Sequence, residues 1–379
     1  MNFDKLKCMV DLHLHLDGAL SIANAKELAK IQNIEIPKKE EIAKLLRVSD
    51  NCRDLNEFLE KFAFPCSLLQ SEIGIKTAVQ NLTKELEEQG LMYAEIRFAP
   101  QKSTDKGLSI DEATAAAIEG AKASPFPVQL ILCAMRGNDN KEENLETVRV
   151  AKKYLEKGVC AVDLAGAEGL FPTDDFADIF EYANREGVPL TIHAGEASGA
   201  QSVKSAVDFG ACRIGHGVRA TEDDSVLTSL AEKQIPLELC PSSNLCTCVF
   251  RDISEYPIRK MLDMGICVTL NTDDPSIENT SIKDEYKLIC DEFKLTEEQI
   301  LSLLLNSVKA SFADEEQKRL MTDMIFTECG IIDRDKLSLY KRQKQTLDTF
   351  LSCGAITESQ YNKSLGDLRV LMKIPREQF

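Results

Sequence analysis

Short apolar runs of β type alternate with amphipathic stretches along most of this chain of 379 residues, and eight of them can be distinguished. The candidate strands are Met9–Leu16, Leu91–Phe98, Pro127–Met135, Val159–Leu164, Pro189–Ala194, Arg213–Gly215, Pro236–Leu239 and Gly265–Asn271. Strands separated by helices predict parallel βα units, and eight such strands are the number that closes a barrel. An open doubly wound sheet is the alternative, but no strand is followed by a G-x-G-x-x-G turn or a Walker lysine. The sequence therefore predicts an α/β fold, a TIM (β/α)8 barrel.

Two segments lie outside this repeat. Ser21–Glu88 is too long for one helix, so we expect several extra helices over the C-terminal face of the barrel. Near the other end of the chain, Leu337–Phe350 and Thr357–Lys373 predict a C-terminal helical hairpin. We therefore expect a metal-dependent barrel domain over residues 1–327. Residues 328–379 are expected to form a helical extension without chemistry of its own, a candidate for homo-oligomer formation.

Charge and cysteine usage narrow the expected partners and location. The formal net charge is −17, which disfavours binding to the phosphate backbone of nucleic acids. The thirteen cysteines are irregularly spaced, and the N-terminal residues M-N-F-D-K-L-K-C do not resemble a signal peptide. No apolar run approaches the roughly 20 residues of a membrane span. The sequence therefore predicts a cytoplasmic protein that binds neither nucleic acid nor membranes.

All four histidines, and a pair of aspartates, occur in short motifs at the ends of candidate strands. The motifs are D-L-H-L-H-L-D-G with His13 and His15, T-I-H-A-G-E with His193, R-I-G-H-G with His216, and L-N-T-D-D-P with Asp273 and Asp274. Barrel enzymes place their active sites at the C-terminal ends of the strands. The repeated context therefore indicates one shared site rather than four unrelated histidines.

The same motifs provide the ligands of a catalytic zinc ion. Because side chains alternate along a strand, the H-x-H pair directs His13 and His15 to the same side. His193 adds a third nitrogen and Asp273 one carboxylate oxygen. This set leaves room for a water molecule, and metal binding would lower the pKa of that water to near 7. We expect one Zn²⁺ per chain.

The remaining motif residues are candidates for acid–base work. Glu196 is the candidate general acid, although a carboxylate at the start of a helix would also be stabilised by the helix dipole. His216 could be a fifth ligand, a group behind the ligands, or a base that orients the attacking hydroxide. Asp274 could bind that hydroxide or the substrate. Four apolar residues share one helical face that forms either core or the wall of a pocket for a flat ring: Leu55, Phe58, Leu59 and Phe62.

These motifs resemble those of the adenosine deaminase family of amidohydrolases. H-L-H-L-D-G-A, D-L-A-G-x-E, H-A-G-E, G-H-G and T-L-N-T-D-D-P occur in the family's order between about Val10 and Ala313. The resemblance implies that zinc is held by the four ligands named above and that Glu196 protonates purine N1. It implies that His216 activates or orients the hydroxide and that Asp274 bonds the hydroxide or ring N7. It also implies that the Gly166 backbone contacts N3, that Asp17 contacts the ribose, and that the four apolar residues form the family's apolar subsite.

The reaction implied by the resemblance is hydrolytic deamination in purine salvage. Zinc-bound hydroxide would attack C6 of adenosine, and of 2′-deoxyadenosine, to give the 6-oxo nucleoside (inosine from adenosine) and ammonia, so the expected partner is a small purine nucleoside. One departure is Ala167, which stands where the family motif A-G-D-E has aspartate. The effect of this change on sugar-side selectivity is open.

Three other functions remain as alternatives. A deaminase of adenine or methylthioadenosine is the first, but adenine deaminases of the fungal type carry Glu where this chain has Asp17, which favours a ribose-bearing substrate. A binuclear amidohydrolase is the second. That class commonly needs a carboxylated lysine at the end of strand four, where this chain has Leu164–Ala165–Gly166. A non-catalytic metal-binding protein is the third, and it would be expected to have lost Glu196, His216 or Asp274.

Overall fold

The computed structural model describes residues 2–36, 38–49, 52–331 and 334–372 of the chain. Its contacts divide the chain into two compact units, Asn2–Phe312 and Ala313–Phe379. The first unit contains the strands and the candidate site. The second is helical.

The first unit is built on eight parallel strands in two four-stranded sheets, ordered β1-β2-β3-β4 and β5-β6-β7-β8. The strands are β1 (Met9–His15), β2 (Leu91–Phe98), β3 (Val128–Met135), β4 (Val159–Ala165), β5 (Thr191–Ala194), β6 (Arg213–His216), β7 (Leu237–Leu239) and β8 (Val268–Leu270). All six pairings within the sheets are parallel. Each observed strand overlaps one of the eight predicted strands, which confirms the predicted α/β barrel class.

Single parallel bridges join the two sheets on both sides. On one side Leu14 pairs with Asp273, and the backbone N–H of Asp273 donates to His13 O at 2.8 Å. On the other side Val162 pairs with Leu190. The strands therefore follow one another around a ring. The first bridge also places the residue that follows β8 beside the two histidines of β1.

The predicted fifth strand begins earlier than the observed one. Pro189 was expected to start it, but β5 begins at Thr191. Proline has no backbone N–H to donate to a ladder, so Pro189 only accepts a bond, from the N–H of Val162 at 2.9 Å.

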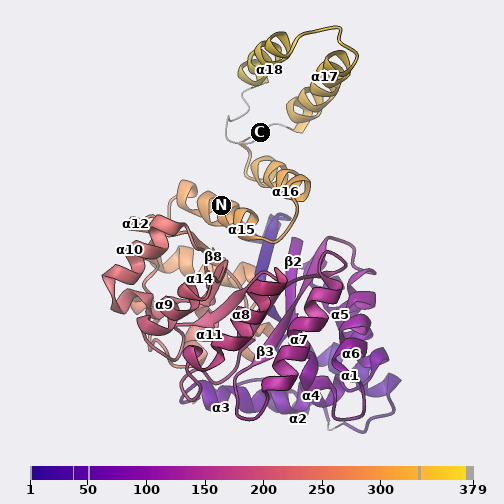
Figure 1. The fold of residues 1–379 in the computed structure, drawn as a ribbon, viewed down its shortest axis with the longest axis vertical. Coiled ribbons are helices and arrows are strands. Elements are labelled where there is room, and N and C mark those ends of the chain that lie inside the picture. Colours follow the sequence, from indigo (N-terminus) through magenta and orange to yellow (C-terminus); the bar gives the residue numbers. More distant parts are fainter. Residues whose placement is uncertain (1, 37, 50–51, 332–333, 373–379) are drawn as a thin grey trace. The chain divides into compact units, whose positions relative to one another are not determined.

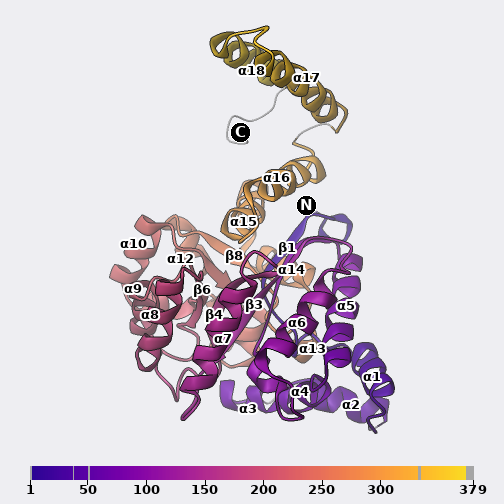
Figure 2. The same ribbon diagram turned by 45° about the vertical axis from the view of Figure 1, so that its right-hand side comes forward.

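Amphipathic helices surround the strands and continue after the last one (Figures 1 and 2). They are α5 (Glu72–Glu88), α6 (Ile110–Ala121), α7 (Lys141–Tyr154), α8 (Ala177–Glu186), α9 (Ala200–Asp208), α10 (Asp224–Lys233), α12 (Ile258–Asp263), α14 (Ile282–Phe293) and α15 (Glu297–Ala310). In α7 the buried residues Asn144, Thr147, Val148 and Ala151 recur at helical spacing. This pattern places one face of the helix against β3 and β4.

Extra helices lie together at one end of the barrel, as Figures 1 and 2 show. They are α1 (Ile22–Ile31), α2 (Lys39–Leu46), α3 (Leu55–Leu59) and α4 (Ala63–Leu68). A 3-10 turn, Glu60–Phe62, joins α3 to α4. The expected apolar face is therefore carried by a short helix and a tighter turn rather than by one long helix. Two short helices, α11 (Pro241–Cys246) and α13 (Pro275–Glu278), follow β7 and β8.

The second unit contains α16 (Glu315–Glu328), α17 (Arg334–Ser352) and α18 (Glu358–Met372). Helices α17 and α18 form the predicted hairpin (Figure 1), although its expected end at Lys373 lies outside the described residues. The Tyr361 hydroxyl donates to Asp348 at 2.6 Å and Arg369 Nε donates to the Tyr340 hydroxyl at 3.2 Å, so polar contacts join the two helices.

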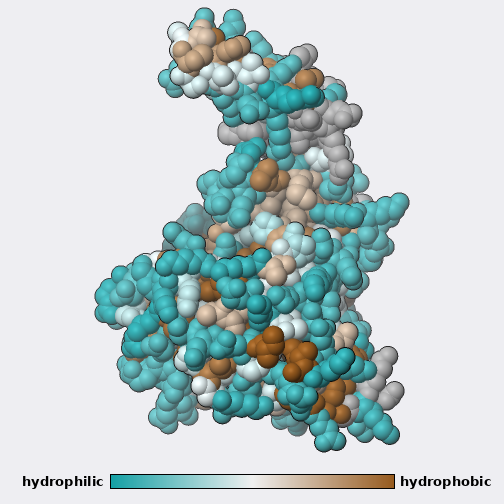
Figure 3. All heavy atoms as spheres, turned by 90° about the vertical axis from the view of Figure 1, so that its right-hand side faces the viewer, coloured by the Kyte–Doolittle hydropathy of each residue, from teal (hydrophilic) through white to brown (hydrophobic). Residues whose placement is uncertain are grey.

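The surface is largely polar where Figure 3 draws it. On the face drawn in Figure 3 hydrophilic residues predominate, and hydrophobic residues form small separate patches. Within the described residues, every helix is too short or too polar to span a lipid bilayer.

Candidate active site

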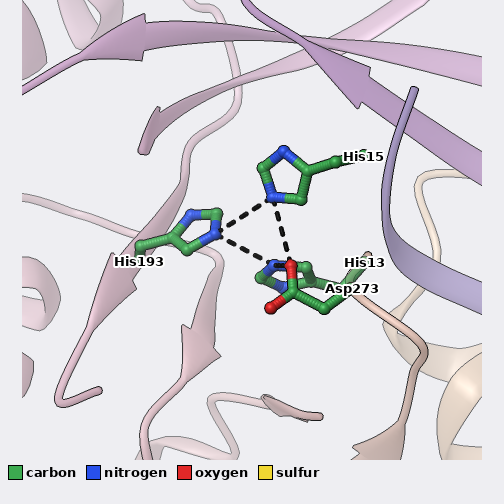
Figure 4. A group of neighbouring side chains, drawn as sticks. All are labelled: His13, His15, His193 and Asp273. Atoms are coloured by element: carbon green, nitrogen blue, oxygen red, sulfur yellow. Dashed lines mark hydrogen bonds and ion pairs between the residues drawn. The ribbon is translucent and has the colours of Figure 1, made fainter. Parts of the chain in front are cut away.

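Four predicted metal ligands meet at the C-terminal ends of the strands (Figure 4). His13 Nε2 lies 3.0 Å from His193 Nε2 and 3.2 Å from Asp273 Oδ1. His15 Nε2 lies 3.3 Å from each of the same two atoms. His13, His193 and Asp273 are buried, and the His15 side chain is 12% exposed. The strand alternation and the β1–β8 bridge thus bring together residues that lie up to 260 positions apart.

Unusual backbone geometry supports this convergence. His216 and Asp273 have φ of 58° and 62°, in a left-handed region that costs free energy for residues other than glycine. Gly215 is needed for a different reason: a Cβ there would lie 2.9 Å from His13 Cε1. The glycine before His216 therefore makes room for a ligand ring.

Two buried carboxylates fix the orientation of the ligand rings. Glu238 Oε2 lies 2.8 Å from His13 Nδ1, and Asp163 Oδ2 lies 2.8 Å from His193 Nδ1. Arg97 spans both carboxylates, with Nη1 at 2.9 Å from Asp163 Oδ2 and Nη2 at 2.8 Å from Glu238 Oε2. Burial would raise the pKa of Asp163, but His193 and Arg97 lower it below its usual range. Ring nitrogens that donate to carboxylates leave Nε2 free to act as a ligand.

This arrangement fits a metal cation. Because both Nδ1 atoms face carboxylates, the Nε2 atoms of His13 and His193 direct lone pairs at each other across 3.0 Å. A cation between them would remove that repulsion. Burial lowers the pKa of His15 and of His193, which favours the neutral rings that metals require. Burial and Arg97 would also lower the pKa of His13, but Asp273 and Glu238 raise it, and a cation at the site would take the place of that proton. Three imidazoles and one carboxylate are a donor set typical of zinc.

Glu196 lies in the turn after β5 and is 4% exposed. Burial, then the charges of Asp273 and Glu168, raises the pKa of Glu196 to about 8. Its Oε2 lies 3.7 Å from His216 Nε2, and Thr247 Oγ1 donates to Oε1 at 3.4 Å. A carboxyl group that keeps its proton near neutral pH is suited to donating it.

The ring of His216 is held from behind. Asn244 Nδ2 lies 3.1 Å from His216 Nδ1, and the Tyr256 hydroxyl donates to Asn244 Oδ1 at 3.0 Å. In this pattern Asn244 donates to Nδ1, so the ring hydrogen is on Nε2, which lies 3.6 Å from Asp273 Oδ2. Burial lowers the pKa of His216 well below its ordinary value, which favours the neutral ring. A neutral ring with its hydrogen on Nε2 can donate a hydrogen bond from that atom into the cavity.

Two of the predicted site carboxylates each have a buried oxygen without a hydrogen-bond partner among the described residues: Asp17 Oδ1 and Asp274 Oδ1. Asp17 accepts from Cys66 Sγ at 3.5 Å through its other oxygen. Asp274 packs against Gly18 so closely that a Cβ at Gly18 would lie 1.7 Å from Asp274 Oδ1. The glycine of the first motif therefore makes room for the aspartate of the last.

Most of the predicted site residues line one cavity of about 450 Å³. Its lining contains all of them except His13: His15, Asp17, Leu55, Phe58, Leu59, Phe62, Gly166, His193, Glu196, His216, Asp273 and Asp274. Ala167 also lines it, where an aspartate was expected from the family motif. Phe58 is buried, and its ring and that of Phe62 lie 6.2 Å apart. The apolar face of α3 and the following turn thus forms one wall of the cavity.

Sequence reasoning assigned no role to Arg97 and Glu238 beneath the site or to Arg136 on the cavity wall, nor to Asp163 and Glu168, although these last two stand in the motif D-L-A-G-x-E. The available signal was a charged residue inside an apolar run, as in Y-A-E-I-R-F, A-V-D-L and P-L-E-L. Strand alternation would have turned these charges towards the inside of the barrel, where an unpaired charge is costly.

A parallel barrel with H-x-H on the first strand, a third histidine on the fifth and an aspartate after the eighth defines a metal-dependent hydrolase of the amidohydrolase class. The family model described as Adenosine deaminase matches residues 8–328. The chain belongs to the adenosine deaminase family. The match ends at 328 whereas contacts divide the chain after Phe312, so the expected boundary at residue 327 stays a prediction.

Individual relatives agree with the family match. An adenosine deaminase of Haemophilus ducreyi is 47% identical over 323 residues, covering 83% of this chain and 94% of that protein. One of Clostridium acetobutylicum is 39% identical over 316 residues, covering 82% and 94%. Among solved structures, an adenine deaminase from Arthrobacter aurescens superposes with a TM-score of 0.75 at 26% identity, covering 83% of this chain and 97% of that one.

Proposed function

We propose that the protein is a zinc-dependent adenosine deaminase that converts adenosine, and 2′-deoxyadenosine, to the corresponding 6-oxo nucleoside and ammonia in purine salvage. The observation that carries the proposal is a buried Glu196 whose pKa is raised to about 8, on a cavity that is also lined by His15, His193 and Asp273 of the His/His/His/Asp group. A proton donor and a water-activating site on one cavity are what hydrolytic removal of a ring amino group requires. The names of the relatives support the same reaction.

His13, His15, His193 and Asp273 would hold one zinc ion, which when bound would lower the pKa of a water at its open position. The protein's own groups do the rest. Glu196 donates its proton to purine N1 as water adds to C6, and Asp274 takes up the proton that the water loses. That proton passes to the C6 amino group, which leaves as ammonia, and the C6 hydroxyl returns its proton to Glu196 as the 6-oxo ring forms. The Nε2 hydrogen of His216 orients the attacking oxygen.

The remaining cavity residues place the nucleoside. Asp274 accepts a hydrogen bond from the attacking water or binds ring N7. The backbone of Gly166 contacts N3, and the apolar wall formed by Leu55, Phe58, Leu59 and Phe62 packs against the ring. Asp17 accepts a hydrogen bond from a ribose hydroxyl, for which its unpartnered Oδ1 is available.

Adenine or methylthioadenosine as substrate is the second candidate, and the likeness to the adenine deaminase of Arthrobacter aurescens favours adenine. The free oxygen of Asp17 favours a nucleoside, since bare adenine has no sugar hydroxyl to offer it. A binuclear hydrolase is disfavoured by Ala165 and Gly166 at the end of β4. Cytoplasmic location, self-association and lack of nucleic-acid binding stay predictions.

The test is ammonia release by purified, zinc-loaded protein from adenosine, 2′-deoxyadenosine, methylthioadenosine and adenine, each at several concentrations. We expect the two adenosines to have the highest kcat/KM. Glu196→Gln is the matched control, because it has the same shape but cannot donate a carboxyl proton. Release of ammonia at equal rates by both proteins would refute the role of Glu196, and adenine as the best substrate would refute the nucleoside assignment.

A further inference from the structure

The buried carboxylate of Glu168 accepts hydrogen bonds from the backbone of the turn that carries Glu196. Glu168 lies just after β4 and is 1% exposed. Its Oε1 accepts from the backbone N–H of Gly195 at 2.7 Å, and its Oε2 accepts from those of Glu196, Ala197 and Ser198 at 3.0, 2.7 and 2.9 Å. Four successive N–H groups of this turn therefore converge on one side chain.

A hydroxyl completes the set of donors. Ser202 Oγ donates to Glu168 Oε1 at 2.5 Å, and Ser198 Oγ donates to the backbone O of Glu168 at 3.3 Å. The carboxylate thus accepts bonds from neutral groups of a single segment, 195–202. Hydrogen bonds to an ionised acceptor are about twice as strong as neutral ones. The contact therefore stabilises one conformation of this segment.

The start of the same turn is fixed independently. Arg136 Nη2 donates to the backbone O of His193 at 2.6 Å and to Thr173 Oγ1 at 3.0 Å, and Thr173 Oγ1 lies 2.8 Å from Ser202 Oγ. Gly195 has φ of 72°, and a Cβ there would lie 2.4 Å from Val203 Cγ2. The turn is therefore held on both sides of the residue that faces the cavity.

We infer that Glu168 is the positioning residue for the proposed general acid: by binding the backbone of residues 195–198 it aims the Glu196 carboxyl into the cavity. Glu168 is absent from the cavity lining, so it acts through Glu196 rather than on the substrate. The chemical part of this inference rests on the proposed function. Its structural part concerns only the turn.

Glu168→Gln tests both parts in zinc-loaded protein. The amide nitrogen of glutamine cannot accept a hydrogen bond. Either the donors to Oε1 (the Gly195 N–H and the Ser202 hydroxyl) or the donors to Oε2 (the N–H groups of residues 196–198) therefore lose their acceptor. We expect hydrogen exchange of the amides of residues 195–198, followed by mass spectrometry, to accelerate at least tenfold. For adenosine we expect kcat to fall about 10- to 100-fold, since a misplacement near 1 Å can cost about that much. KM should change less than about threefold, because the ring and ribose contacts stay in place.

Glu285→Gln is the matched control for loss of a buried carboxylate, because Glu285 accepts from the Ser242 backbone N–H at 3.0 Å and from the Thr280 hydroxyl. It should leave exchange of residues 195–198 unchanged. If Glu168→Gln does not fold, Glu168→Asp, which keeps the charge but shortens the reach, should accelerate the same amides.

Unchanged exchange at 195–198 in the folded variant would overturn the inference whatever the activity. Accelerated exchange with a kcat within about threefold of the wild-type value would also overturn it, since the turn would then not position the acid. An inactive wild-type protein would refute the proposed function instead, and exchange alone would decide the role of Glu168.

Discussion

Replacing Arg97 with methionine should weaken both the barrel and its metal site. The Arg97 side chain is fully buried on β2, and its guanidinium also donates to Leu12 O at 2.7 Å. Methionine fills much of the volume but removes the charge that lies between Asp163 and Glu238. The negative charges of Asp163 and Glu238 would then repel each other, because no cation would lie between them.

The size of the effect follows from these contacts. Removing one partner of a buried ion pair costs about 3–5 kcal/mol, because it leaves an uncompensated charge. Asp163 keeps His193, and Glu238 keeps His13 and Arg213, so we expect the lower end, about 3 kcal/mol of unfolding free energy. The same carboxylates orient two ligand rings, so zinc affinity should fall about 10- to 100-fold.

Two measurements separate these effects. Denaturant unfolding of the metal-free protein gives the loss of stability, and competition with a chelator gives the zinc affinity. Arg213→Met is the matched control, because Arg213 is buried and binds Glu238 and Glu95 but not Asp163. It should destabilise the barrel to a similar degree but reduce zinc affinity less than about tenfold. Equal losses of affinity in the two variants, or wild-type affinity in Arg97→Met, would refute the bridging role.

Four further predictions concern other parts of the first unit. Glu196→Gln should keep zinc but lose about 10²- to 10⁴-fold in turnover, the range of general acid catalysis, and near-normal turnover would exclude it as the acid. Gly18→Ala should displace Asp274, which a Cβ would meet at 1.7 Å, and kcat/KM should fall at least tenfold without loss of zinc by elemental analysis. Asp17→Ala should lower kcat/KM for adenosine by about 10- to 150-fold, which corresponds to the loss of one hydrogen bond to a charged group. The rate on adenine should change little, and equal losses on both substrates would contradict a contact between Asp17 and the ribose. Burial raises the pKa of Glu285 to about 7 from 4.5, so the folded state binds the extra proton and the contribution of Glu285 to stability should be lost as pH rises from about 4.5 to 7. Unfolding curves of Glu285→Gln should lack this contribution, so its stability should fall less over this range than that of the wild type; an unchanged slope would contradict the shift.

The strands and the four-ligand group could be predicted from the sequence because each pattern that indicates them lies within a few consecutive residues. Alternation within D-L-H-L-H-L-D places His13 and His15 on one side of β1 without knowledge of any other strand. The rule that barrel sites lie at strand ends then added His193 and Asp273. The structure brings these four within 4.8 Å of one another.

The polar interior was not accessible in the same way. Arg97 shares its apolar run with Glu95, and Glu238 is the one charge in its own run; the sequence does not say which charge on which other strand each will meet. Arg97 Nη2 reaches Glu238 Oε2 across 141 positions of chain, and Arg213 Nη2 reaches Glu95 Oε2 across 118. Such pairings depend on the closure and register of the barrel, which no local pattern encodes.

The interior network and the unusual backbone of the site depend on each other. His216 and Asp273 sit in a conformation that costs on the order of 1 kcal/mol or more each, so their strands must be held firmly. Arg213, at the start of β6, is bound to Glu95 of β2 and Glu238 of β7, and so anchors the strand that ends at His216. Asp273 is held by two backbone hydrogen bonds to β1. The buried charges beneath the site therefore stabilise strand ends that aim polar side chains into the cavity, and a substitution such as Arg213→Met should loosen His216 before it unfolds the barrel.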